Sequence, residues 1–127
     1  MIILDTSVLV EGLGRDGDVR SSIRGALRAC HRMVLPALVL YEWLRGPRVE
    51  EELALQEALV PAEGALPFTE AEAAVAARLY KTVDRPRGRE VDLAIAAFAF
   101  TWQGQLWTLN ERDFRDIPNL PLFRPPT

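Results

Sequence analysis

Short apolar runs alternate along the chain with segments in which apolar residues recur at helical spacing. The apolar runs predict strands at residues 1–4, 33–35, 66–68, 106–109 and 120–123. The helical spacing predicts helices at residues 8–13, 18–30, 37–45, 49–59, 69–83 and 90–103. This alternation is typical of a parallel sheet covered by helices on both faces. We therefore expect an α/β fold, a three-layer α/β/α sandwich around a central, mainly parallel sheet of four or five strands.

Residues that cap or break helices mark several of these boundaries. Asp18 is expected to cap the second helix, and Thr69-Glu70-Ala71-Glu72 has the capping-box pattern that opens a helix. Most residues of the 90–103 segment are apolar, so this helix should be buried on most sides, and Gly104 should end it. Pro67 indicates that the 66–68 strand lies at an edge or starts there.

The composition is that of one ordinary globular domain. The chain has 127 residues, of which 49% are hydrophobic and 26% charged, which favours one domain spanning residues 1–127. Cys30 is the only cysteine, which excludes a disulfide framework and a cysteine-based metal cluster. The apolar run at residues 1–4 is too short for a signal peptide, and no apolar stretch is long enough to span a bilayer. We expect a soluble, cytoplasmic protein.

Acidic residues are expected to gather at one edge of the sheet. Asp5 follows the first strand, Asp113 comes shortly after the 106–109 strand, and Asp92 lies in the first turn of the apolar helix. Ligands of an open parallel sheet bind beyond the carboxyl ends of its strands, where these residues should lie. Glu42 joins them because it stands inside an otherwise apolar helix, and acids are rarely buried without a partner.

Each of these acids also has a purely structural interpretation. Asp5 or Asp92 could cap a helix, and Asp113 could be an ordinary turn residue. Glu42 could reach solvent or pair with an arginine.

The four acids together indicate a cation. Two carboxylates about 4 Å apart repel by about 4 kcal/mol at an effective dielectric constant near 20. Four of them in one pocket therefore require a cation or shared protons. An all-oxygen ligand set without histidine or cysteine favours Mg²⁺ or Mn²⁺ over zinc. A site of this kind can activate water for phosphodiester hydrolysis.

The chain resembles the PIN-domain ribonucleases, and among them the VapC-like toxins of bacterial and archaeal toxin–antitoxin pairs. The similar segments are Ile3-Leu4-Asp5-Thr6-Ser7, Glu42-Trp43-Leu44 with Gly46, Asp92-Leu93-Ala94-Ile95-Ala96-Ala97, and Thr108-Leu109-Asn110-Glu111-Arg112-Asp113-Phe114. They follow the order and the usual spacing of the family over essentially the whole chain. No single segment is specific, but their joint occurrence is.

The resemblance implies a PIN-like fold and an endoribonuclease that depends on Mg²⁺ or Mn²⁺. Its catalytic and metal-binding pocket would consist of Asp5, Glu42, Asp92 and Asp113. Residues beside the acids would orient the carboxylates or metal-bound water, namely Thr6 or Ser7, and Asn110. Members of the family typically form homodimers and are inhibited by a small antitoxin whose C-terminal segment occupies the groove of the active site.

Other charged residues near the acids suggest secondary roles. Acids that could assist or replace Asp92 and Asp113 are Glu90, Glu111 and Asp116. The formal net charge of −3 argues against RNA binding through overall charge, so local basic residues would be needed. The candidates are Arg85, Arg87 and Arg89, which could clamp an RNA backbone beside the acids or belong to a solvated loop.

Competing functional classes lack residues that they require. The 12–17 segment has the glycine spacing of dinucleotide-binding loops, but a helical turn separates it from the first strand, so we interpret it as a flexible loop near the mouth of the site. A phospho-acceptor receiver needs a lysine after a strand, whereas Lys81 lies in a predicted helix. A haloacid-dehalogenase-like phosphatase needs an aspartate where Ser7 stands. The open alternative is a catalytically lapsed PIN fold that acts as a binding module for protein or RNA.

Overall fold

The structure, a computed structural model, describes residues 1–14 and 17–126. Its strands are β1 (Ile2–Leu4), β2 (Met33–Val34) and β3 (Gln105–Trp107). Its α-helices are α1 (Thr6–Gly14), α2 (Asp18–Arg28), α3 (Ala37–Arg45), α4 (Glu50–Leu59), α5 (Glu70–Thr82) and α6 (Glu90–Thr101). Two short 3₁₀ helices are η1 (Ala62–Gly64) and η2 (Glu111–Phe114). The predicted α/β alternation is confirmed.

The strands form one parallel sheet in the order β2-β1-β3. Single parallel bridges extend it at both edges, from Pro36 to Leu66 and from Leu106 to Leu122. These bridges stand where we predicted edge strands at residues 66–68 and 120–123. A proline stands beside Leu66 and beside Leu122, as is common in edge strands.

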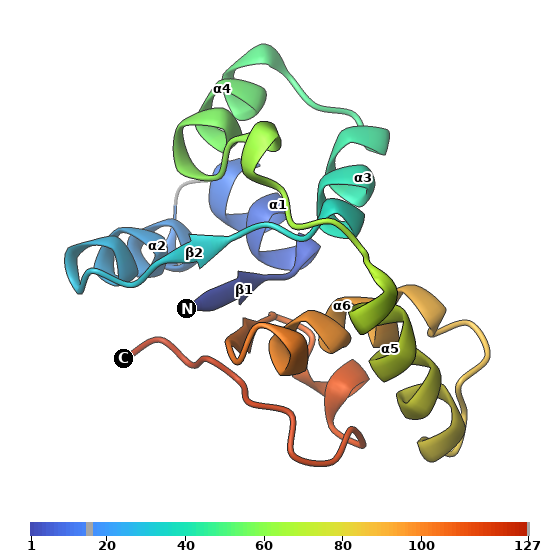
Figure 1. Cartoon of the computed structure of the whole chain (residues 1–127). Coiled ribbons are helices and arrows are strands. Elements are labelled where there is room, and N and C mark those ends of the chain that lie inside the picture. Colours follow the sequence, from blue (N-terminus) through green and yellow to red (C-terminus); the bar gives the residue numbers. More distant parts are fainter. Residues whose placement is uncertain (15–16, 127) are drawn as a thin grey trace.

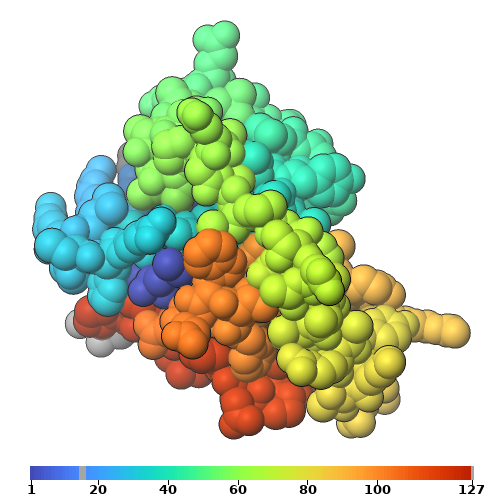
Figure 2. Space-filling view, viewed as in Figure 1, coloured from blue at the N-terminus to red at the C-terminus, as the bar shows by residue number. Residues whose placement is uncertain are grey.

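Helices enclose the sheet on both sides. In Figure 1, β1 and β2 lie between a group formed by α1 to α4 and a second group formed by α5 and α6. The three residues of β1 are completely buried, and Figure 2 shows only a small patch of this N-terminal segment at the surface. Helix α6 is buried from Leu93 to Ala99, as its apolar sequence predicted. The three-layer arrangement is confirmed, and none of the described helices is long and apolar enough to cross a membrane.

The capping box is confirmed and two other predicted helix ends are corrected. The backbone N–H of Thr69 donates to Glu72 Oε1 at 2.8 Å, and the Thr69 hydroxyl donates to the same carboxylate. Asp18 is the first residue of α2 and makes no capping bond, because Gly17 occupies the N-cap position. After α6 the left-handed residue is Gln103, with φ of 52°, rather than Gly104.

The loop predicted at residues 12–17 is instead helical up to Gly14, and Gly12 lets two helices pack together. Gly12 and Gly14 lie within α1, Gly17 precedes α2, and residues 15 and 16 lie outside the described residues. A Cβ atom at position 12 would lie 2.4 Å from Ile23 Cδ1. The absence of a side chain at Gly12 therefore lets α1 approach α2.

Candidate functional site

A cavity of about 520 Å³ opens at the carboxyl end of the sheet. Its walls come from the end of β1, the start of α1, the middle of α3, the first turn of α6 and the segment after β3. The lining residues are Asp5, Thr6, Ser7, Val10, Glu11, Glu42, Asp92, Leu109 and Asn110. Three of the four predicted acids therefore share one cavity with all three predicted orienting residues.

Asp5 is held by hydroxyl groups from two separate segments. Its side chain is buried, and Oδ2 accepts hydrogen bonds from Ser7 Oγ at 3.0 Å and from Thr108 Oγ1 at 2.7 Å. No described residue donates a hydrogen bond to Oδ1. Because these donors are hydroxyls rather than backbone N–H groups of α1, the side chain of Asp5 does not cap this helix.

Thr108 is a site residue to which the sequence assigned no role. It is buried directly after β3, and its hydroxyl accepts a hydrogen bond from the backbone N–H of Asn110 at 3.0 Å. The Ser7 hydroxyl likewise accepts one from the backbone N–H of Leu109 at 3.0 Å. The signal available in the sequence was the position of Thr108 at the end of a strand neighbouring the one that leads to Asp5.

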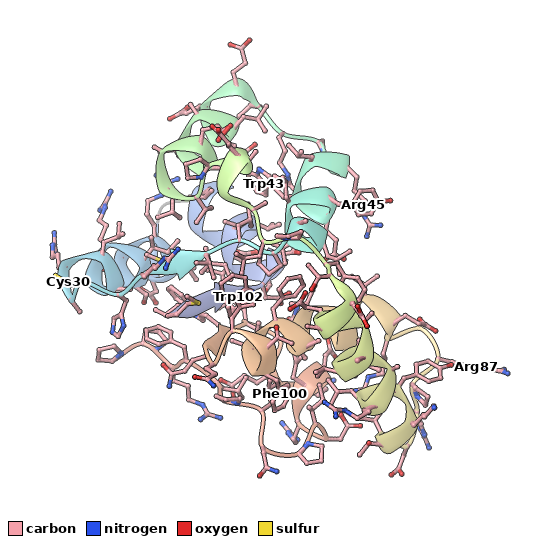
Figure 3. The ribbon with its side chains drawn as sticks, in the orientation of Figure 1. Cys30, Trp43, Arg45, Arg87, Phe100 and Trp102 are labelled. Carbon is pink, nitrogen blue, oxygen red and sulfur yellow. The ribbon has the colours of Figure 1, made fainter. Side chains whose placement is uncertain are left out.

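Glu42 faces α1 from the middle of α3. Thr6 Oγ1 donates to Glu42 Oε1 at 2.6 Å, and Arg45 Nη2 lies 3.6 Å from Glu42 Oε2. The Arg45 side chain is 57% exposed, against 19% for Glu42, so this ion pair is screened by solvent. Figure 3 shows Arg45 at the outer side of α3. Thr6 therefore orients Glu42, and the arginine partner considered from the sequence is present as well.

The Asp92 carboxylate lines the cavity and has no hydrogen-bond donor among the described residues. It lies in the first turn of α6, is partly buried, and accepts no hydrogen bond from any described residue. Its pKa is raised from 3.8 to about 6, first by burial and then by the negative charges of the three other acids, while Arg89 opposes the rise. The acids are thus close enough to act on one another electrostatically.

Asp113 lies at the rim rather than in the cavity itself. It belongs to η2 and lines an adjoining hollow of about 450 Å³. The two hollows share Leu109 and Asn110 as walls. The charge of Asp113 still contributes to the raised pKa of Asp92.

The acids considered as substitutes are engaged by other groups. Gly88 N–H donates to Glu90 Oε1 at 3.2 Å, and Arg124 binds Glu111 with its closest contact at 2.8 Å. Asp116 is bound by Arg89. None of the three acids lines the cavity that holds Asp5.

The three arginines near Asp92 differ in their surroundings. Arg89 forms an ion pair with Asp116, which raises the pKa of Arg89 and lowers that of Asp116. Arg85 and Arg87 are exposed, and Figure 3 shows Arg87 extending away from the body of the molecule.

The free oxygens of the cavity fit a hard divalent cation. Asp5 Oδ1 and both oxygens of Asp92 accept no hydrogen bond from the described residues, and carboxylate oxygens are the ligands that Mg²⁺ and Mn²⁺ prefer. No three histidine, cysteine or acidic side chains within residues 1–14 and 17–126 form a ready-made cage for a metal ion. The donor set therefore fits an ion that keeps part of its water shell, as Mg²⁺ usually does.

Comparisons with known proteins agree with the fold. The family model "PIN domain" matches residues 2–120, and no curated protein matches the chain. The chain is 25% identical to a chain of FitAcB from Neisseria gonorrhoeae, with 98% of each chain covered and a TM-score of 0.71. It is 21% identical to a chain of VapBC2 from Rickettsia felis bound to a DNA fragment from their promoter, with coverage of 97% and 98% and a TM-score of 0.73.

A structure of FitAB bound to an IR36 DNA fragment is also similar, with 24% identity, coverage of 97% of this chain and 94% of that chain, and a TM-score of 0.68. The resemblance predicted from the sequence is thereby confirmed, and PIN domains are a family of nucleases. The match extends over nearly all of the sequence, including every acid of the cavity and its rim. The chain belongs to the PIN domain family.

Proposed function

We propose that this protein is a metal-dependent endoribonuclease, the VapC-like toxin of a toxin–antitoxin pair. The proposal rests on the surroundings of the Asp92 carboxylate. This carboxylate is partly buried with no hydrogen-bond donor, in a cavity shared with Asp5 and Glu42. Carboxylates arranged in this way repel one another until a cation binds among them.

The residues divide into ligands and orienting groups. Asp5 and Asp92 would hold Mg²⁺ or Mn²⁺, with Glu42 and Asp113 beside them, and the ion would supply activation of water and stabilisation of charge on the phosphate. Ser7 and Thr108 fix the direction of the Asp5 carboxylate. Thr6 does the same for Glu42, and Asn110 forms part of the wall that faces them.

RNA would reach the acids from the side of the exposed arginines. The overall charge of −3 repels a polyanion, so Arg85 and Arg87 would supply the local attraction. Both side chains are exposed at the loop that leads into α6, the helix that carries Asp92. This position supports contact with the RNA backbone beside the acidic cavity.

A protein inhibitor is part of the proposal. Similar folds occur in structures named as the complexes FitAcB, FitAB and VapBC2. We infer from this likeness that a small antitoxin pairs with the chain and covers its active site. Homodimer formation and a cytoplasmic location follow from the same family resemblance.

Cleavage of RNA by the purified protein, freed of any antitoxin, tests the proposal. A labelled pool of total RNA is incubated with Mg²⁺, with Mn²⁺ and with EDTA. We expect cutting with either metal, none with EDTA, and a loss of at least about 100-fold in Asp5→Asn, because a metal ligand is lost. Asp84→Asn, at an exposed aspartate that lines neither hollow, should cut like the parent. Absence of metal-dependent cutting in the folded parent would favour the lapsed binding module.

A further inference from the structure

The Arg89 guanidinium connects the start of α6 with the segment that carries Asp113. Arg89 is the N-cap residue of α6, three positions before Asp92. Its Nη2 donates to the backbone carbonyl of Asp113 at 2.9 Å and to Asp116 Oδ1 at 2.6 Å. Its Nη1 donates to Asp116 Oδ2 at 2.9 Å. The result is a two-pronged ion pair with a further bond to the backbone, a geometry that arginine can form and lysine cannot.

The segment that carries Asp113 is short and depends on such contacts. The side chains of Phe114 and Ile117 attach this segment to the core, where both are buried. At its start the ion pair of Glu111 with Arg124 is exposed, with 38% and 68% of the two side chains accessible. In the pair of Arg89 with Asp116 the arginine is better shielded, with 21% of its side chain exposed against 46% for Asp116, and Arg89 also bonds directly to the backbone of Asp113. Its contribution to the position of Asp113 should therefore exceed that of the exposed pair.

The same contacts argue against a direct role of Arg89 in RNA binding. Both terminal nitrogens are occupied by Asp116 and Asp113, and Nη1 also approaches the Arg85 carbonyl at 3.4 Å. These bonds engage the four N–H groups of Nη1 and Nη2, so a phosphate could make a two-pronged contact with this guanidinium only by displacing one of these partners. Arg85 and Arg87 carry no ion pair within the described residues.

We infer that Arg89, held by Asp116, is a positioning residue that sets Asp113 against Asp92. The role in catalysis rests on the proposed nuclease function, whereas the role in holding the Asp113 segment does not. Asp116 then belongs to the site as the anchor of Arg89, and not as a spare acid. Of the three arginines, Arg85 and Arg87 remain for the RNA backbone.

Substitution of the anchor distinguishes a positioning role from an RNA-binding role. In Asp116→Asn, a positioning role predicts Mn²⁺ affinity lowered about 10- to 100-fold and slower cleavage, with RNA affinity in EDTA not increased. An RNA-binding role predicts that RNA binds Asp116→Asn more tightly than the parent. The substitution removes the negative charge of Asp116 and releases the Arg89 guanidinium for a phosphate. Arg89→Lys adds a second test, since lysine retains the charge but not the two-pronged geometry. A positioning role predicts that this variant loses Mn²⁺ affinity as well.

Hydrogen exchange of the metal-free protein tests the structural part independently of catalysis. The backbone N–H groups of Asp113 and Ile117 donate to Asn110 and Phe114 carbonyls at 2.9 and 3.1 Å. We expect these amides to exchange about tenfold faster in Asp116→Asn and in Arg89→Lys. Unchanged exchange at these amides in both folded variants would overturn the inference, whatever the parent does with RNA.

Two matched variants control for the effect of removing a surface charge on hydrogen exchange and Mn²⁺ affinity. Asp84→Asn and Arg115→Gln change exposed residues whose side chains form no hydrogen bond or ion pair with a described residue, and both should match the parent in exchange and in Mn²⁺ affinity. Thermal unfolding followed by circular dichroism verifies that each variant is folded. A parent that neither binds Mn²⁺ nor cuts RNA would contradict the proposed function, while the exchange data would still decide whether Arg89 holds the Asp113 segment.

Discussion

Thr108 donates its hydroxyl proton to Asp5 Oδ2 at 2.7 Å, across 103 positions of sequence. The same hydroxyl accepts a hydrogen bond from the backbone N–H of Asn110 at 3.0 Å, which leaves its proton directed at the carboxylate. The segment after β3 is thereby tied to the aspartate that follows β1. Both hydroxyl donors of Asp5 bind Oδ2, which leaves Oδ1 without a donor among the described residues.

Thr108→Val should impair the site more than the fold. Valine is close in shape but lacks the hydroxyl, so Asp5 loses one of its two donors and the Asn110 N–H loses its acceptor. We expect cleavage and Mn²⁺ affinity to fall about 10- to 100-fold and stability to fall by about 1–2 kcal/mol. Thr108→Ser retains the hydroxyl and should recover most of the activity. Equal activity of the valine variant and the parent would show that Ser7 alone orients Asp5.

Asp92 should make stability depend on pH in a defined direction. Its pKa is about 6 in the folded protein against 3.8 as the ordinary value, so between these values the folded state binds more protons than the unfolded state. The contribution of Asp92 to stability is therefore complete below pH 3.8 and is lost as pH rises through about 6. Allowing for partial exposure, Asp92→Asn should be more stable than the metal-free parent by about 1–2 kcal/mol at pH 7.

Urea unfolding of both proteins from about pH 4 to pH 7 measures this difference. The advantage of Asp92→Asn should shrink toward zero at the acid end, where the aspartate is neutral in the folded parent. A difference between the two proteins that stays constant over this range would mean that Asp92 is not the group that titrates.

Divalent metal should stabilise the folded protein through the same carboxylates. A ligand that binds only the folded state adds about 2.7 kcal/mol at a concentration of 100 times its Kd. We expect Mn²⁺ to raise the Tm at pH 7, EDTA to reverse the rise, and the effect to weaken below pH 6 as Asp92 takes up its proton. In Asp92→Asn the rise should be small, whereas Asp84→Asn should retain it. An equal rise in Asp92→Asn would place the metal elsewhere.

Gly104→Ala should destabilise the junction of α6 and β3. A Cβ atom there would lie 3.1 Å from both the Met1 carbonyl oxygen and Ile3 Cγ1, and Ile3 is completely buried. Crowding of this kind costs about 1–3 kcal/mol. Gly64→Ala is the control, because a Cβ there meets no atom within 4 Å and should change stability by less than about 0.5 kcal/mol. Equal unfolding free energies of the two variants in urea would contradict this account of Gly104.

Sequence patterns formed by neighbouring residues, such as helical spacing and a capping box, predicted the bounds of helices well. The helix predicted at residues 37–45 has the same bounds as α3, and the Thr69–Glu72 capping box opens α5 as predicted. The lengths of the two edge strands were overestimated. An apolar run does not show how many of its residues form backbone hydrogen bonds with a neighbouring strand. Gly104 was misassigned as a helix end because close packing against β1 and a left-handed turn both favour glycine.

The sequence by itself determined the order of the elements, the PIN-like fold and the candidate acids, which follow β1 and β3, begin α6 or lie within α3. These features depend on residue type and short spacing, which a sequence displays directly. Tertiary structure alone decided that Thr108 holds Asp5, that Arg89 is engaged by Asp116, and that Asp92 lacks a donor. Each depends on burial and on distances between segments far apart in the chain. Such distances arise only when the helices pack on the sheet, so no local pattern carries them.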